Sequence, residues 1–189
     1  MNRTTQIAKQ FREVYLDGDW VATTNLKAQL SDITWEQATT KIGTLNTIAA
    51  LAFHINYYVV GVANVLEGEP LTIRDKYSFD FPSIKSQKDW ENLLDKMWSD
   101  AEKFSALVED MPDEKLSEVF VDEKYGDYER NLHVIIEHTY YHFGQIVLIK
   151  KLLLYFLMLL KYSNKLCFNI FKYYGYGSKK SILLILFRS

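Results

Sequence analysis

Two histidines lie one helical turn apart in the segment HTYYHFGQI, residues 138–146. At about 100° per residue, His138 and His142 differ by about 40° around a helix, so both imidazoles face the same side. The chain has four histidines in all, and two of them stand in this segment. The spacing suits either a packed polar pair or two ligands of one metal ion. Gln145 lies on the same stripe of the helix.

A third imidazole for such a site must come from elsewhere, because His133 falls half a turn away from the pair on the same helix. His54 is the remaining histidine, in the middle of the uncharged segment 46–66. Its small neighbours on that face, Ala50 and Gly61, leave room for a ligand or a substrate. Burying an unpaired imidazole costs on the order of a few kcal/mol, so His54 needs coordination or a hydrogen bond.

Three neutral imidazoles on one divalent ion leave at least one coordination position for water or substrate, which is typical of catalytic rather than structural sites. Nitrogen ligands suit Zn, Ni, Fe or Cu, and the sequence alone does not choose among these metals. The plainer alternative is that His138 and His142 are surface residues and that His54 is a core residue satisfied by a hydrogen bond. Both interpretations are compatible with the sequence.

Four helical stretches can position these histidines, and no alternating pattern is long enough for a sheet. We therefore predict an all-α protein, a four-helix bundle. The long segment between the second and third stretches, residues 68–86, carries two prolines and no helical period. Such a link lets a bundle cross over instead of turning straight back. The predicted helices span residues 4–16, 46–66, 86–111 and about 130 to at least 152, with a short helical piece around 21–30.

Local signals mark where several of these helices begin and end. Thr34 and Gln37 have the spacing of a capping box, and Ser86 can cap the third long helix. Gly68 suits the end of the second helix, and Gly126 lies in a predicted turn.

Composition excludes several classes of protein. The chain has 189 residues, the size of one ordinary domain, and a formal net charge of −2 without a basic cluster for nucleic acid. The single cysteine, Cys167, excludes an internal disulfide framework and agrees with a cytoplasmic protein. The N-terminus lacks the apolar core of a signal peptide, and we find no uninterrupted apolar stretch of about 18 residues, so no membrane-spanning segment is expected.

The end of the chain differs from the rest. All 24 acidic residues lie within residues 1–151, whereas residues 152–189 hold six basic residues and no acid. We divide the chain into a helical bundle, residues 1–153, and a hydrophobic basic tail, residues 154–189. The tail is either the product of a read-through or frameshift, or a real segment that docks on a membrane or a partner. Its apolar runs, Leu152–Leu160 and Ile182–Phe187, are too short to span a bilayer. Lys150 and Lys151 are expected to be a solvated helix end.

The arrangement of His54 followed by His138-x-x-x-His142-x-Gly144-Gln145 resembles the DinB-like family, also called the YfiT-like metal-dependent family. The resemblance covers roughly residues 4–153. It implies a bundle with an up-down-down-up path, a divalent metal, Ni or Zn, at the three histidines, and a homodimer. Characterised members of the family are S-transferases and isomerases that use thiols such as bacillithiol, mycothiol or glutathione.

The resemblance suggests a thiol-dependent S-transferase, in which a small-molecule thiol bound at His54, His138 and His142 attacks an electrophile. Water in place of the thiol makes the protein a metal-dependent hydrolase. A third hypothesis is a metal-binding bundle without catalysis, since fold does not determine function. Tyr58 and Gln145 are candidates for holding the ligands or orienting a substrate. No general base is evident in the sequence.

Overall fold

The computed structural model describes residues 2–20 and 22–174, with side chains described up to residue 156 and at 158 and 159. The apolar run Ile182–Phe187 and the side chain of Cys167 therefore lie outside the described residues. The described part is all-helical apart from one isolated β-bridge, Val119 with Asp127, which confirms the all-α prediction. Its α-helices are α1 (Arg3–Tyr15), α2 (Leu26–Leu30), α3 (Trp35–Thr39), α4 (Ile48–Leu66), α5 (Gln87–Glu109) and α6 (Tyr128–Tyr174). Three 3-10 turns join them: η1 (Asp75–Tyr77), η2 (Asp113–Ser117) and η3 (Glu123–Tyr125).

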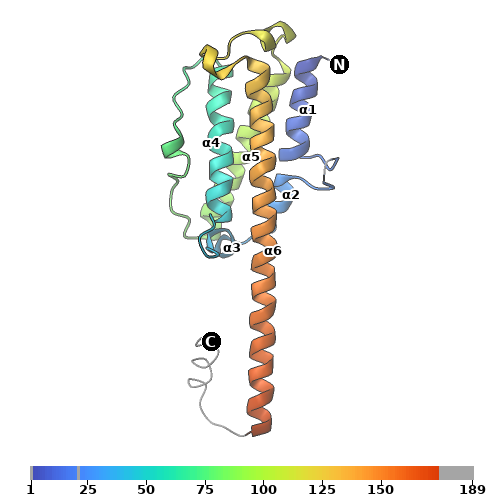
Figure 1. Cartoon of the computed structure of the whole chain (residues 1–189), viewed down its shortest axis with the longest axis vertical. Coiled ribbons are helices and arrows are strands. Elements are labelled where there is room, and N and C mark those ends of the chain that lie inside the picture. The colour runs from blue at the N-terminus through green and yellow to red at the C-terminus, as the bar shows by residue number, and fades with distance from the viewer. Residues whose placement is uncertain (1, 21, 175–189) are drawn as a thin grey trace. The chain divides into compact units, whose positions relative to one another are not determined.

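The long helices follow the up-down-down-up path. Figure 1 shows α1 and the bundle part of α6 running in one direction and α4 and α5 in the other. The segment between α4 and α5 passes back along the length of α4, so these two helices lie parallel (Figure 1). This is the crossover that the two prolines and the lack of helical period in the link predicted.

The helix boundaries carry the capping residues that the sequence predicted. Thr34 and Gln37 form a complete capping box at the start of α3. The Ser86 hydroxyl accepts a hydrogen bond from the backbone N–H of Asp89 at 3.1 Å, which caps α5. Gly68 follows the last turn of α4 with φ +92°, a conformation that favours glycine.

The core lies where α1, α4 and α5 meet. Phe11 and Phe104 pack with ring centroids 4.5 Å apart, and both are fully buried. A buried polar chain crosses the same three helices: the Tyr15 hydroxyl donates to Asn56 Oδ1, and Asn56 Nδ2 donates to Asp100 Oδ2 at 2.6 Å. Such a chain satisfies the polar groups that the core encloses, so it also defines the register between the helices.

Helix α4 is long and apolar enough to cross a membrane by length and composition alone, although its apolar stretch is interrupted. Its mean hydropathy is 1.5, even though polar residues interrupt the apolar stretch. However, 67% of this apolar stretch is buried inside the bundle, as in the core helix of a protein that does not span a membrane. We therefore treat α4 as the central core helix; it is the one helix among the described residues that passes this test.

The prediction that Lys150 is a solvated helix end is wrong. Its Nζ donates to the backbone carbonyl of Gln29 at 2.9 Å and to Asp32 Oδ1 at 2.5 Å. The side chain is 19% exposed, so its aliphatic part is packed while the ammonium is paired. Lys150 thus ties α6 to α2 and to Asp32, which follows α2.

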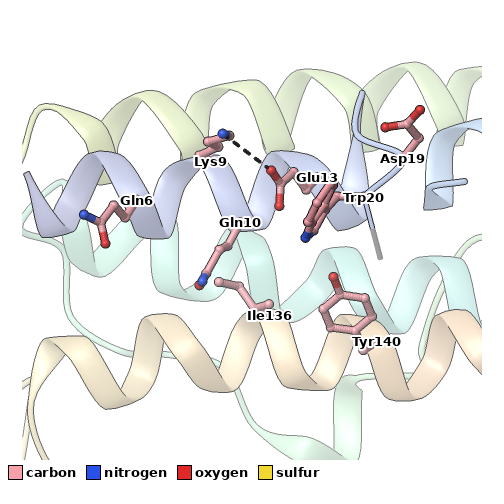
Figure 2. Close-up of a pocket in the computed structure, with 8 residues that line it drawn as sticks. All are labelled: Gln6, Lys9, Gln10, Glu13, Asp19, Trp20, Ile136 and Tyr140. Atoms are coloured by element: carbon pink, nitrogen blue, oxygen red, sulfur yellow. Dashed lines mark ion pairs between the residues drawn. The ribbon is translucent and has the colours of Figure 1, made fainter. Parts of the chain in front are cut away.

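The chain divides into two units, Met1–Lys150 and Lys151–Ser189. Helix α6 continues through this division to Tyr174, beyond residue 154, where we predicted the tail to begin. All residues of the candidate metal centre and of the groove between α1 and α6 (Figure 2) belong to the first unit.

Candidate metal centre

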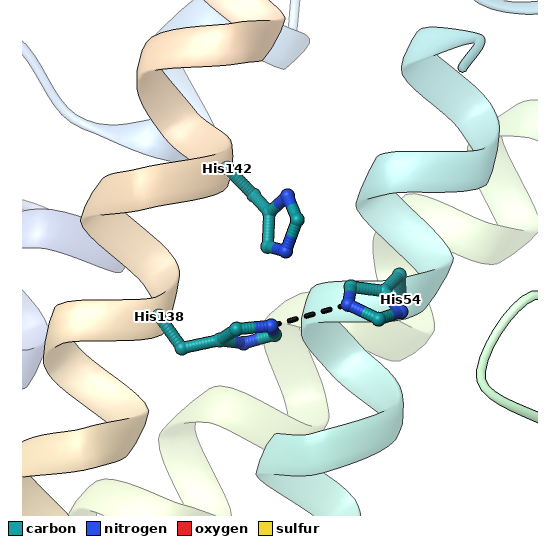
Figure 3. A group of neighbouring side chains, drawn as sticks. All are labelled: His54, His138 and His142. Atoms are coloured by element: carbon teal, nitrogen blue, oxygen red, sulfur yellow. Dashed lines mark hydrogen bonds between the residues drawn. The ribbon is translucent and has the colours of Figure 1, made fainter. Parts of the chain in front are cut away.

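Three histidines from two helices converge on one point. His54 projects from α4, and His138 and His142 project from consecutive turns of α6 (Figure 3). One ring nitrogen of each histidine lies within 4.8 Å of the other two, and His54 Nε2 is 3.1 Å from His138 Nε2. Two imidazole ligands of one tetrahedral ion lie about 3.3 Å apart when each metal–nitrogen distance is about 2.0–2.1 Å. The three histidines can therefore hold a divalent metal ion.

The sequence places these residues through helical periodicity. On α6 the buried apolar residues Ile135, Ile146 and Ile149 hold one side of the helix against the bundle. His138 and His142 lie at the edge of this side, half-buried and buried respectively. His54 is buried on the face of α4 that looks toward α6. His133 does not join the group, as its half-turn displacement predicted.

All three imidazoles favour the neutral form, which is the form that binds metal. Burial, and then the neighbouring rings of His142 and His54, together lower the pKa of His138 to about 4. The pKa of His54 is lowered by burial and then by His142. Burial also lowers the pKa of His142, although its hydrogen bond to Gln145 acts in the opposite direction.

Gln145 holds His142, as its position on the stripe suggested. The Gln145 Oε1 atom lies 2.7 Å from His142 Nδ1. An amide oxygen accepts a hydrogen bond, so this contact assigns the proton of His142 to Nδ1 and leaves the Nε2 lone pair free for a metal.

The outward nitrogen of His54 is less well satisfied. His54 Nδ1 is buried and makes no hydrogen bond of standard geometry among the described residues. The backbone of Ser78 lies near His54 and raises its pKa, which opposes the effect of burial. A proton on Nδ1 directed toward Ser78 leaves Nε2 free, and Nε2 is the atom that faces His138.

The segment from residue 73 to residue 79, here named the strap, covers this side of α4. The ring of Phe79 stacks on His54 with centroids 4.1 Å apart and planes 11° from parallel. The Tyr58 hydroxyl donates to Asp75 Oδ1 at 2.8 Å. Burial and Asp75 raise the pKa of Tyr58 to about 12, so the phenol stays protonated. Its ring centroid is 4.9 Å from that of His138.

Sequence reasoning missed the residues of the strap. Phe79, Ser78 and Asp75 belong to the link that had no helical period, so no pattern connected them with His54. The prediction that Gly61 leaves room for a ligand is also wrong. A Cβ at Gly61 would lie 2.5 Å from the side chain of Ile73, so the strap already occupies that space. Glycine is needed at this position because the strap approaches α4 closely there.

The described residues provide three ligands and no fourth histidine, cysteine or carboxylate in the same group. A comparison with family models matches residues 16–146 to the DinB superfamily. The chain belongs to the DinB superfamily. The matched range includes all three histidines and Gln145, so the DinB region and the candidate metal centre coincide. Comparisons with curated proteins and with solved structures gave no significant match.

Proposed function

We propose that this DinB-superfamily protein is a metal-dependent enzyme that joins a small-molecule thiol to an electrophile. One observation carries the proposal: three neutral imidazoles converge from two helices without a fourth protein ligand among the described residues. A structural site uses four protein ligands, whereas a site with three keeps a position for a reactant.

The three histidines would hold the ion, Ni or Zn, through the nitrogens that face one another. When bound, such an ion supplies Lewis-acid chemistry that lowers the pKa of a thiol. Gln145 keeps His142 in the tautomer that presents Nε2. Phe79 lies flat on His54 and restricts the rotation of that ring. Tyr58, protonated and anchored by Asp75, presents an aromatic edge to His54 and His138.

In the proposed reaction the thiol loses its proton to water, a sulfur–carbon bond forms, and the leaving group departs with the electron pair of its broken bond to carbon. The same three-ligand arrangement suits attack by water, so hydrolysis is the alternative activity. Small-molecule thiols are kept reduced in the cytoplasm, which is where we propose the protein acts.

The first test is metal content, measured by elemental analysis of the full chain purified without a histidine tag. We expect about one Ni or Zn per chain in the wild type, given ligation by one site of three histidines, and loss of the metal in His142→Ala. Absence of metal in the wild type after reconstitution would exclude the metal-dependent enzyme.

The second test is turnover. The metal-loaded protein is given glutathione or bacillithiol with 1-chloro-2,4-dinitrobenzene, which releases chloride as the thioether forms. Thioether formation that His142→Ala lacks would support the transferase. Ester hydrolysis without thioether formation would favour the hydrolase, and a loaded but inactive protein would leave a metal-binding bundle without catalysis.

A further inference from the structure

A groove with a volume of about 760 Å³ lies between α1 and α6 (Figure 2). Helix α1 contributes Gln10 and Glu13, and α6 contributes Ile136 and Tyr140. Tyr140 is two residues from each histidine of α6, which places it about 160° around the helix from both. The groove is therefore separate from the candidate metal centre.

The groove has an exposed indole at one end. Trp20 is 84% exposed, the highest value among the large hydrophobic residues of the described chain. The turn that carries it is anchored, because a Cβ at Gly18 would lie 2.3 Å from Glu13 Cα and Asn25 Nδ2 donates to the Gly18 carbonyl at 2.8 Å. Trp20 lines the same groove as Glu13 (Figure 2). An exposed indole leaves its aromatic face open to a ligand, and that face attracts cations.

The charge in the groove is mainly negative. Glu13 has Lys9 as its ion-pair partner at 3.9 Å, beyond hydrogen-bond distance, and Asp19 adds a second carboxylate to the lining. The Tyr140 hydroxyl points toward Glu13 across the groove (Figure 2). Burial, and then the negative charge of Glu13, raises the pKa of Tyr140. Such a surface disfavours anions and leaves Glu13 able to accept further donors.

We propose that the groove binds a small organic cation, with its ammonium or N-methylated ammonium group between the Glu13 carboxylate and the indole of Trp20. A cation is attracted to the face of an aromatic ring, most strongly to that of tryptophan. It is also attracted to a carboxylate that can still accept hydrogen bonds. The apolar part of the ligand lies against Ile136 and Tyr140, which line the opposite wall.

Choline is the probe, and its neutral isostere 3,3-dimethylbutan-1-ol is the control, because the two differ in charge and hardly in shape. Binding to the full-length, metal-loaded protein is measured by isothermal titration calorimetry at constant ionic strength. We expect a millimolar Kd for choline and binding of the alcohol at least about tenfold weaker. Equal binding of the two compounds, or no binding of choline at about 50 mM, would overturn the proposal.

Variants of the groove residues test whether choline binds in the groove and not elsewhere on the protein. Glu13→Gln and Trp20→Ala should each weaken choline binding about fivefold or more, with Trp20→Phe between them and the wild type. Glu109→Gln, an exposed position at the end of α5, is the matched control and should bind choline as the wild type does. Unchanged choline binding in both Glu13→Gln and Trp20→Ala would refute the site. Metal content and thermal unfolding should stay at wild-type values in Glu13→Gln, which excludes a loss of folding as the cause.

Discussion

The hydrogen bond between His142 Nδ1 and Gln145 Oε1 decides which nitrogen of His142 faces the other two histidines. Its loss frees the ring to rotate and to change tautomer. We expect Gln145→Ala to weaken metal binding about 10- to 100-fold, the usual effect of removing a partner of a ligating histidine. Competition with a chelator of known affinity measures the change.

Gln145→Glu is the matched variant for this prediction. A carboxylate oxygen still accepts from Nδ1 and makes the imidazole a stronger ligand, so metal binding should be kept or improved. Wild-type affinity in Gln145→Ala would show that the hydrogen bond does not orient the ligand.

The lowered pKa of His138 links the stability of the metal-free protein to pH. The unfolded chain takes up a proton near pH 6.5, the ordinary value, whereas the folded protein does so near pH 4. Between these values the unfolded state binds more protons, so the free energy of unfolding rises with pH. We expect stability to fall as the pH drops from 6.5 toward 4, measured by urea unfolding in the presence of a chelator. In His138→Gln the free energy of unfolding should change less with pH. The same slope as in the wild type would contradict the lowered pKa of His138.

At the scale of elements, the strap is the part of the link that docks on α4. Ile73 packs where Gly61 lacks a side chain, Arg74 exchanges two backbone hydrogen bonds with the Tyr57 hydroxyl, and Phe79 stacks on His54. These contacts follow one another along two turns of α4. The position of Phe79 on the metal centre therefore depends on contacts made farther along the same helix.

We expect Gly61→Ala to displace the strap, because its Cβ would lie 2.5 Å from the side chain of Ile73. Alanine is favoured over glycine within a helix by about 1 kcal/mol, so α4 itself should remain intact. The expected result is faster proteolytic cleavage within residues 67–86 and weaker metal binding at unchanged helical content. The double variant Gly61→Ala with Ile73→Ala should restore both properties. Failure of this rescue would mean that the substitution acts on α4 and not through the strap.

At the scale of the whole molecule, the homodimer remains a prediction, and the surface of α6 offers a place for it. Val134, Tyr141 and Leu148 are 37%, 65% and 56% exposed and recur every seven residues along the helix. An exposed apolar stripe of this period suits packing against a second helix. We expect Leu148→Glu to shift the protein from dimer to monomer in light scattering after size-exclusion chromatography.

Lys88→Glu, which places the same charge at an exposed position of α5, is the control and should stay dimeric. A dimer that survives Leu148→Glu would place the interface elsewhere. A wild type that is monomeric at all accessible concentrations would refute the homodimer.

The sequence by itself determined the features that depend on neighbours along the chain. Helical period predicted the long helices, side-chain chemistry predicted the caps at Thr34 and Ser86, and the four-residue spacing put His138 and His142 on one face. Gln145 was found for the same reason. All of these follow from the geometry of a single helix, which is local.

Only the tertiary structure decided what lies across from these residues. It brought His54 to within 3.1 Å of His138, filled the space at Gly61 with Ile73, laid Phe79 on His54 and paired Lys150 with Asp32. Each of these contacts joins residues that are remote in sequence, and the strap has no period from which its course could be predicted. Such contacts depend on how whole helices and links pack against one another. Local sequence patterns do not distinguish among the possible side-chain partners, and the packing of the folded chain selects one of them.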